Sequence, residues 1–112
     1  AEVLLNYAEA KAELGELTDA DWAATIGALR SRAGITGGTP QTGTLTTRPS
    51  SAEPYIASYY PTISDPSLLE IRRERGIELC LEGLRLNDLK RWNCCDLWVN
   101  DPWEGIFIPS LN

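Results

Sequence analysis

The sequence predicts an all-α fold with long irregular loops, because three observations favour helices. Strong helix formers fill residues 1–14, where apolar side chains recur at three- and four-residue steps. Glycines and capping residues divide residues 1–34 into two helices. A proline after an acidic residue then opens a charged segment at residues 64–92. The composition, with 43% hydrophobic and 23% charged residues, is that of a globular domain.

Residues 1–34 are predicted to form a helical hairpin with a short loop. The first helix is expected to end at Gly15, because glycine readily adopts the left-handed conformation that follows a helix. Thr18 can cap the second helix with its side chain. Tyr7 and Trp22 lie on the predicted apolar faces of the two helices, so both are expected in the core.

Residues 35–63 are predicted to be a loop insertion. Thr, Ser, Gly and Pro dominate this segment, and its prolines interrupt any regular hydrogen-bond ladder. Its second half carries Tyr55, Tyr59 and Tyr60. These tyrosines either pin the loop onto the helices or face outward as flat binding surfaces.

Residues 64–92 are predicted to be a helical segment. Its long helix is expected to begin at Asp65 or Ser67, both of which can act as a cap, and to run to about Gly83. A short helix over residues 86–92 follows it or continues it with a bend. The residues expected on the buried side are Ile77, Cys80, Leu81 and Leu84.

Glutamates recur every four residues from Glu70 to Glu82, and like charges at that spacing cost ~0.2–0.5 kcal/mol per pair. We therefore expect arginine partners on adjacent turns: Glu70 with Arg73, Arg75 with Glu78, and Glu82 with Arg85. A glycosidase pair is a poor interpretation, because carboxylates on one helix face cannot flank a scissile bond from two directions. We interpret the set as a structural ion-pair lattice in which loss of Glu82 or Arg85 damages folding. Its expected members are Arg73, Glu74, Arg75, Glu78, Glu82, Arg85, Asp88 and Arg91.

The composition argues against several classes of function. A net charge of −6 disfavours nucleic-acid binding, which usually needs a basic patch. The chain has no histidine, the commonest general base and metal ligand, so we expect no catalytic residue, metal or cofactor. No apolar stretch is long enough to span a bilayer. The absence of methionine and the helical start at Ala1 predict either an internal fragment of a longer protein or a chain that has been trimmed.

The three cysteines leave two alternatives open. Cys94 and Cys95 are adjacent, and a bridge between neighbours is strained. We expect buried or half-buried thiols, with a disulfide from Cys80 to one of the other two as the alternative.

Four sequence blocks, taken in order, resemble the SusD/RagB family. They are Leu5-Asn6-Tyr7-Ala8-Glu9-Ala10; Leu29-Arg30-Ser31-Arg32-Ala33-Gly34; Ile71-Arg72-Arg73-Glu74-Arg75 with Glu78-Leu79; and Glu82-Gly83-Leu84-Arg85 with Asp88-Leu89-Lys90-Arg91-Trp92. The resemblance covers nearly the whole chain and implies the C-terminal part of a longer protein. It also implies an all-helical fold with a tetratricopeptide-like hairpin and a loop-rich remainder. Gly76 and the Leu86-Asn87 pair depart from the family pattern, which implies local repacking.

The resemblance implies an outward-facing lipoprotein of the outer membrane in Bacteroidetes-type bacteria. Such proteins bind oligosaccharides or other nutrients over a TonB-dependent SusC-like transporter, without catalytic residues or cofactors. Membrane attachment would come only through a lipid anchor outside this chain. The alternative is a helix-repeat scaffold for protein–protein interaction without a small-molecule ligand.

Aromatic residues outside the predicted helices are the candidates for sugar binding. Four Trp and four Tyr stand against one Phe, and both Trp and Tyr combine a flat face with a polar group. Trp92, which ends the last helical block, is expected in the core instead. Residues 93–112 are expected to be an irregular tail. The candidate ligand-binding residues are Trp98, Trp103, Tyr59, Tyr60 and Tyr55.

Overall fold

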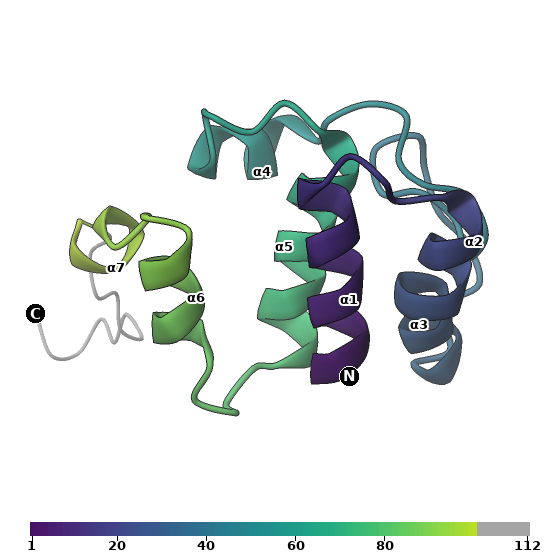
Figure 1. Cartoon of the computed structure of the whole chain (residues 1–112), viewed down its shortest axis with the longest axis horizontal. Coiled ribbons are helices and arrows are strands. Elements are labelled where there is room, and N and C mark those ends of the chain that lie inside the picture. Colours follow the sequence, from purple (N-terminus) through teal and green to yellow (C-terminus); the bar gives the residue numbers. More distant parts are fainter. Residues whose placement is uncertain (101–112) are drawn as a thin grey trace, which may run out of the picture.

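The computed structural model describes residues 1–100, and this part of the chain is helical with no strand (Figure 1). The predicted all-α class is therefore confirmed. The elements are α1 (Glu2–Glu13), α2 (Asp19–Trp22), the π-helical η1 (Ala23–Gly27), α3 (Ala28–Arg32), α4 (Pro54–Tyr59), α5 (Pro66–Glu78), α6 (Arg85–Arg91) and α7 (Asp96–Val99). None of the helices in this range combines the length and the apolar character that crossing a membrane requires.

The predicted hairpin forms. Its first arm is α1, and its second arm consists of α2, η1 and α3, which follow one another without a break. Thr18 caps α2 by accepting from the Asp21 backbone N–H, and the Asp21 carboxylate accepts from Thr18 in return. Trp22 is fully buried, as predicted. The prediction for Tyr7 is wrong: its ring is 48% exposed and its hydroxyl donates to Asp21 Oδ1 at 3.1 Å. The buried face of α1 lies elsewhere, on Leu5, Ala8, Glu9 and Ala12.

The core lies where α1 packs between α5 on one side and α2–η1–α3 on the other (Figure 1). Apolar side chains from all of these elements interlock there and exclude water, which is the main source of folding energy. The largest of them are fully buried, so the hairpin and α5 form one packed unit. The cluster consists of Leu5, Ala8, Ala12, Leu17, Trp22, Ile26, Leu29, Leu68, Ile71 and Leu79.

Helix α5 starts as predicted but ends early. Asp65 caps it by accepting from the Ser67 backbone N–H at 2.9 Å. The helix stops at Glu78 rather than near Gly83, and Leu81 adopts a left-handed φ of 64° beyond that end. Three of the four residues expected on its buried side do not pack inward: Cys80 and Leu81 lie beyond the end of the helix, and Ile77 lies on the exposed side of its last turn. Ile77, Cys80 and Leu81 are exposed, and only Leu84 packs against the core.

The predictions of an irregular loop and an irregular tail are each wrong at one place, where a short helix forms. Within residues 35–63 the chain forms α4, because Glu53 caps the backbone N–H groups of Tyr55 and Ile56 and Pro54 occupies the first turn. Within the predicted tail it forms α7. The rest of residues 35–63 is irregular, as predicted.

Replacing Gly27 by alanine is expected to destabilise the protein by about 1–3 kcal/mol, the range for overpacking a core. A Cβ at this position would lie 2.0 Å from the backbone carbonyl oxygen of Leu45, so the loop or the helix must move. Gly37→Ala is the matched control, because a Cβ there meets nothing within 4 Å. Denaturant unfolding of the whole protein measures both variants, and equal midpoints would contradict the prediction.

Candidate ligand-binding site

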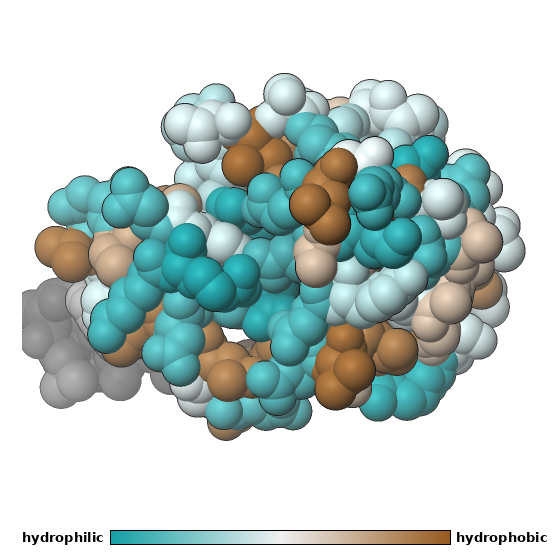
Figure 2. All heavy atoms as spheres, in the orientation of Figure 1, coloured by the Kyte–Doolittle hydropathy of each residue, from teal (hydrophilic) through white to brown (hydrophobic). Residues whose placement is uncertain are grey.

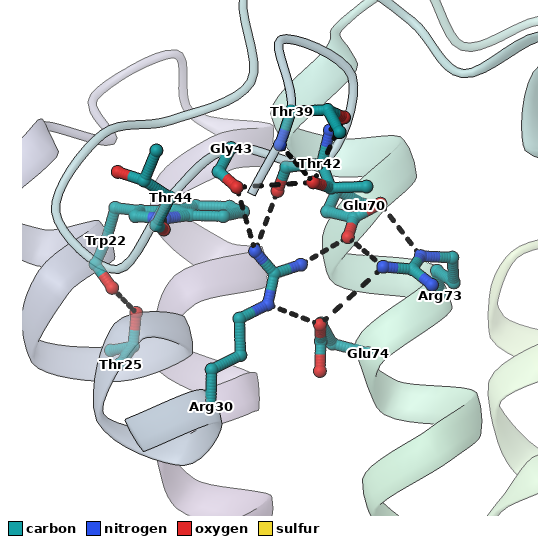
Figure 3. Close-up of polar contacts among 10 residues, drawn as sticks. All are labelled: Trp22, Thr25, Arg30, Thr39, Thr42, Gly43, Thr44, Glu70, Arg73 and Glu74. Atoms are coloured by element: carbon teal, nitrogen blue, oxygen red, sulfur yellow. Dashed lines mark hydrogen bonds and ion pairs between the residues drawn. The ribbon is translucent and has the colours of Figure 1, made fainter. Parts of the chain in front are cut away.

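One buried ion-pair network fastens α3 to α5 (Figure 3). Arg30 is 3% exposed, and it donates to Glu70 and, at 2.7 Å from Nε, to Glu74. Its Nη1 also donates to the Thr42 carbonyl at 2.8 Å, which fixes the neighbouring loop. Arg73 pairs with Glu70 from the same helix, as predicted, with Nε–Oε2 at 2.9 Å. Two glutamates and Arg30, all buried, and the half-buried Arg73 therefore neutralise one another.

A second network joins α1, α5 and α6. Arg75 makes a bidentate pair with Asp88, with nitrogen–oxygen distances of 3.0 and 2.8 Å, and its Nη1 donates to Asn6 at 2.7 Å. Arg91 donates to Glu9 at 2.8 Å and to Asp88 at 2.9 Å. The carboxylates of Glu9 and Asp88 thus hold α6 against the other helices.

Hydrogen bonds of this second network favour the charged forms of Asp88 and Arg91. Burial opposes ionisation of Asp88, but hydrogen bonds from Arg75 and Arg91 outweigh it and hold the pKa of that carboxyl below its ordinary value of 3.8. The hydrogen bond to Glu9 raises the pKa of Arg91 further above its usual range, against the opposing effect of burial. These groups are therefore held in pairs that join helices, which indicates a structural role.

Two of the predicted pairs do not form. Arg75 turns to the second network, so Glu78 accepts instead from Arg32 of α3 at 2.6 Å. Glu82 lies exposed beyond the end of α5 and forms no ion pair within residues 1–100. Arg85 faces aromatic rings instead of a carboxylate. The early end of α5 separates Glu82 and Arg85, because they no longer share one helix.

The three candidate tyrosines lie in different environments. Tyr55 and Tyr59 pack edge to face on α4, with ring centroids 5.1 Å apart and hydroxyl oxygens 2.6 Å apart. Tyr55 is exposed and Tyr59 half-buried. Tyr60 is buried and packs edge-on against Trp92, which is half-buried rather than in the core as predicted. Tyr55 and Tyr59 therefore offer ring surface to a ligand, whereas Tyr60 can offer only its edge or hydroxyl.

Trp98 lies on α7, is 45% exposed and lines a cavity of about 470 Å³. Leu79, Leu81 and Leu86 form much of the apolar wall. Figure 2 shows this hollow between α5 and α6, with hydrophobic residues on its rim. The volume falls in the ~300–1,000 Å³ range of ligand pockets, and an apolar wall with few polar groups is their usual lining. Trp103, the other candidate tryptophan, lies outside the described residues.

The cysteines are free thiols, so the alternative of a disulfide is not realised. Cys94 is half-buried as expected, whereas Cys80 and Cys95 are exposed because both lie in turns. Within residues 1–100, no three His, Cys, Asp or Glu side chains gather in a way that could hold a metal ion.

A helical scaffold clamped by buried ion pairs, with an exposed ring beside an apolar cavity, has the construction of a helical binding protein. The model of the SusD family matches residues 1–107, and the chain belongs to this SusD/RagB family. The family consists of glycan- and nutrient-binding proteins associated with the outer cell surface. No curated protein and no solved structure matches the chain.

Proposed function

We propose that this chain is part of a cell-surface lipoprotein that binds glycans or other nutrients and delivers them to a TonB-dependent SusC-like transporter. The observation that carries the proposal is the match of residues 1–107 to the SusD family. Attachment would be through a lipid anchor, and the membrane would be the outer membrane of a Bacteroidetes-type bacterium.

The cavity beside Trp98 is the surface on which we place the ligand. Sugar rings have apolar faces that stack on aromatic rings, and a tryptophan adds an N–H that can hydrogen-bond a hydroxyl. Tyr55 and Tyr59 present a second pair of rings on α4. The charged groups of the two ion-pair networks are satisfied by one another, which leaves recognition to the rings and to the polar groups beside them.

Replacing Trp98 by alanine is expected to weaken oligosaccharide binding at least tenfold, because truncating an aromatic hot-spot residue costs about 2 kcal/mol or more. Isothermal titration of the whole protein with a panel of oligosaccharides measures the affinity. Tyr7→Ala is the matched control, since that ring is 48% exposed but does not line this cavity. Trp103→Ala is tested in the same way.

The outcomes separate the proposal from its alternative. If affinity survives the loss of Trp98 and of Trp103, the ligand lies elsewhere on the protein. If no oligosaccharide gives heat but the protein still captures a SusC-like transporter, the helix-repeat scaffold without a small ligand is the better description.

A further inference from the structure

Arg72 is a buried cation that the fold leaves short of partners. It is 5% exposed, and its Nε has no hydrogen-bond partner among residues 1–100. Its guanidinium lies against the rings of Tyr60 and Trp92, 4.7 and 4.5 Å from their centroids. The carboxylate paired with it, Glu13, is 3.9 Å away on a half-exposed side chain. Buried charges normally need close, hydrogen-bonded counter-ions, so this arrangement has unused capacity for an anion.

Arg85 adds a second cation to the same place. Its Nη2 donates to the Tyr60 hydroxyl at 3.4 Å, and its guanidinium lies 5.7 Å from the Trp92 ring centroid. Among the arginines of residues 1–100 it alone forms no ion pair, whereas most of the others have a carboxylate within 3 Å. In a chain of net charge −6, acidic residues are in excess. Two neighbouring arginines without close carboxylates therefore stand out.

These two arginines line a hollow of about 170 Å³ together with Tyr59 and Tyr60. No acidic side chain lines it, and Arg73, which also contributes, is already paired with Glu70. We call it the Arg72–Arg85 hollow.

Arg72 also lines a larger hollow of about 650 Å³ on the side of α1. Glu9 and Glu13 line that second hollow and would repel an anion there. Arg91 lines that hollow too, so its two glutamates face two arginines, whereas the charged residues of the Arg72–Arg85 hollow are all arginines.

We propose that the Arg72–Arg85 hollow receives the acidic group of an anionic glycan, a carboxylate or a sulfate ester. Guanidinium groups bind carboxylates and sulfate esters alike through charge-assisted, paired hydrogen bonds. The side chains of Tyr59 and Tyr60, which also line the hollow, would border the attached sugar ring. The inference rests on the proposed function and narrows its ligands to acidic carbohydrates. The hollow is small, so it takes the acidic substituent while the rest of the oligosaccharide extends toward α4.

The test uses Arg85→Gln, because Arg85 is exposed and its substitution leaves no cavity in the core. The whole protein is titrated calorimetrically with oligosaccharides bearing uronate or sulfate groups and with their methyl-esterified or desulfated counterparts. We expect the acidic member of a pair to bind at least tenfold more tightly at low salt, and added salt to reduce the difference. In Arg85→Gln the acidic member loses at least five times more affinity than its neutral counterpart, a ratio from which any shared effect on the cavity beside Trp98, which Arg85 also lines, cancels. Arg32→Gln, the same substitution at an exposed arginine outside the hollow, keeps the preference.

Each other outcome overturns the inference in a recognisable way. Equal affinity for acidic and neutral members rejects it and leaves the proposed function standing. A preference for acidic members that Arg85→Gln does not change places the acidic group elsewhere. Loss of transporter capture in Arg85→Gln, with glycan binding unchanged, means that the hollow holds an acidic side chain of a protein partner. No heat from either kind of oligosaccharide rejects the inference together with the proposed function.

Discussion

Replacing Glu70 by alanine is expected to lower the free energy of unfolding by about 3–5 kcal/mol, the usual loss when one member of a buried ion pair is removed. Glu70 is 1% exposed and accepts from both Arg30 and Arg73. Without it, Arg30 stays buried beside one carboxylate instead of two. The shift of the midpoint in urea unfolding of the whole protein, followed by circular dichroism, measures the loss.

Glu82→Ala is the matched control for this prediction. It is the same substitution in the same four-residue series, but Glu82 is exposed and forms no ion pair among the described residues. Its loss is expected to change stability by no more than about 0.5 kcal/mol. This reverses the expectation from sequence that Glu82 is a structural residue. Equal losses in the two variants would contradict the prediction, because they would show that the burial and pairing of Glu70 add nothing beyond the effect of an exposed glutamate.

Features that depend on a few neighbouring residues could be predicted from the sequence. The cap at Asp65, the cap at Thr18 and the pair between Glu70 and Arg73 each involve residues at most three apart. Helix starts follow from such local hydrogen bonds. The helical hairpin and the all-α class follow in turn from these starts and from the apolar spacing.

Features that depend on distant parts of the chain could not be predicted in this way. Arg30 and Glu70 are 40 residues apart, and Arg91 and Glu9 are 82 residues apart. Pairing rules for a single helix relate only residues three or four apart, so they assigned Arg75 to Glu78. The early end of α5 had no signal either, because the residues before Gly83 are good helix formers and tertiary packing decides the break.

The candidate binding residues show the same division. Their type was readable, because Trp and Tyr outnumber Phe, but their exposure was not. Tyr55 and Tyr60 differ in exposure because of the way α4 packs on α5, which buries the ring of Tyr60 and leaves that of Tyr55 exposed. Pairing along one helix leaves Arg72 without a carboxylate, but its position beside Arg85 and two aromatic rings depends on the fold.

Replacing Arg75 by alanine is the second large effect that we expect, a loss of about 3–5 kcal/mol in stability. Arg75 is 4% exposed and is the point where α1, α5 and α6 meet, through its pairs with Asn6 and Asp88. Without it, Asp88 keeps only the half-exposed Arg91 as a partner. Side-chain pairs such as this one, rather than close backbone packing, hold α6 to the other helices. In Arg75→Ala the amide hydrogens of α6 are therefore expected to exchange faster than in the parent, and faster than those of α1 and α5.

Arg32→Ala is the control, since Arg32 also pairs with a glutamate of α5 but is 64% exposed through its side chain. Exposed ion pairs contribute ~0–1 kcal/mol, so this variant should unfold close to the parent and leave exchange in α6 unchanged. The same comparison connects stability with binding. Arg75 and α6 line the cavity beside Trp98, so a loosened α6 should also weaken oligosaccharide binding in Arg75→Ala but not in Arg32→Ala. Slow, parent-like exchange in α6 of Arg75→Ala would mean that Leu89 and the remaining pair between Glu9 and Arg91 suffice to hold the helix.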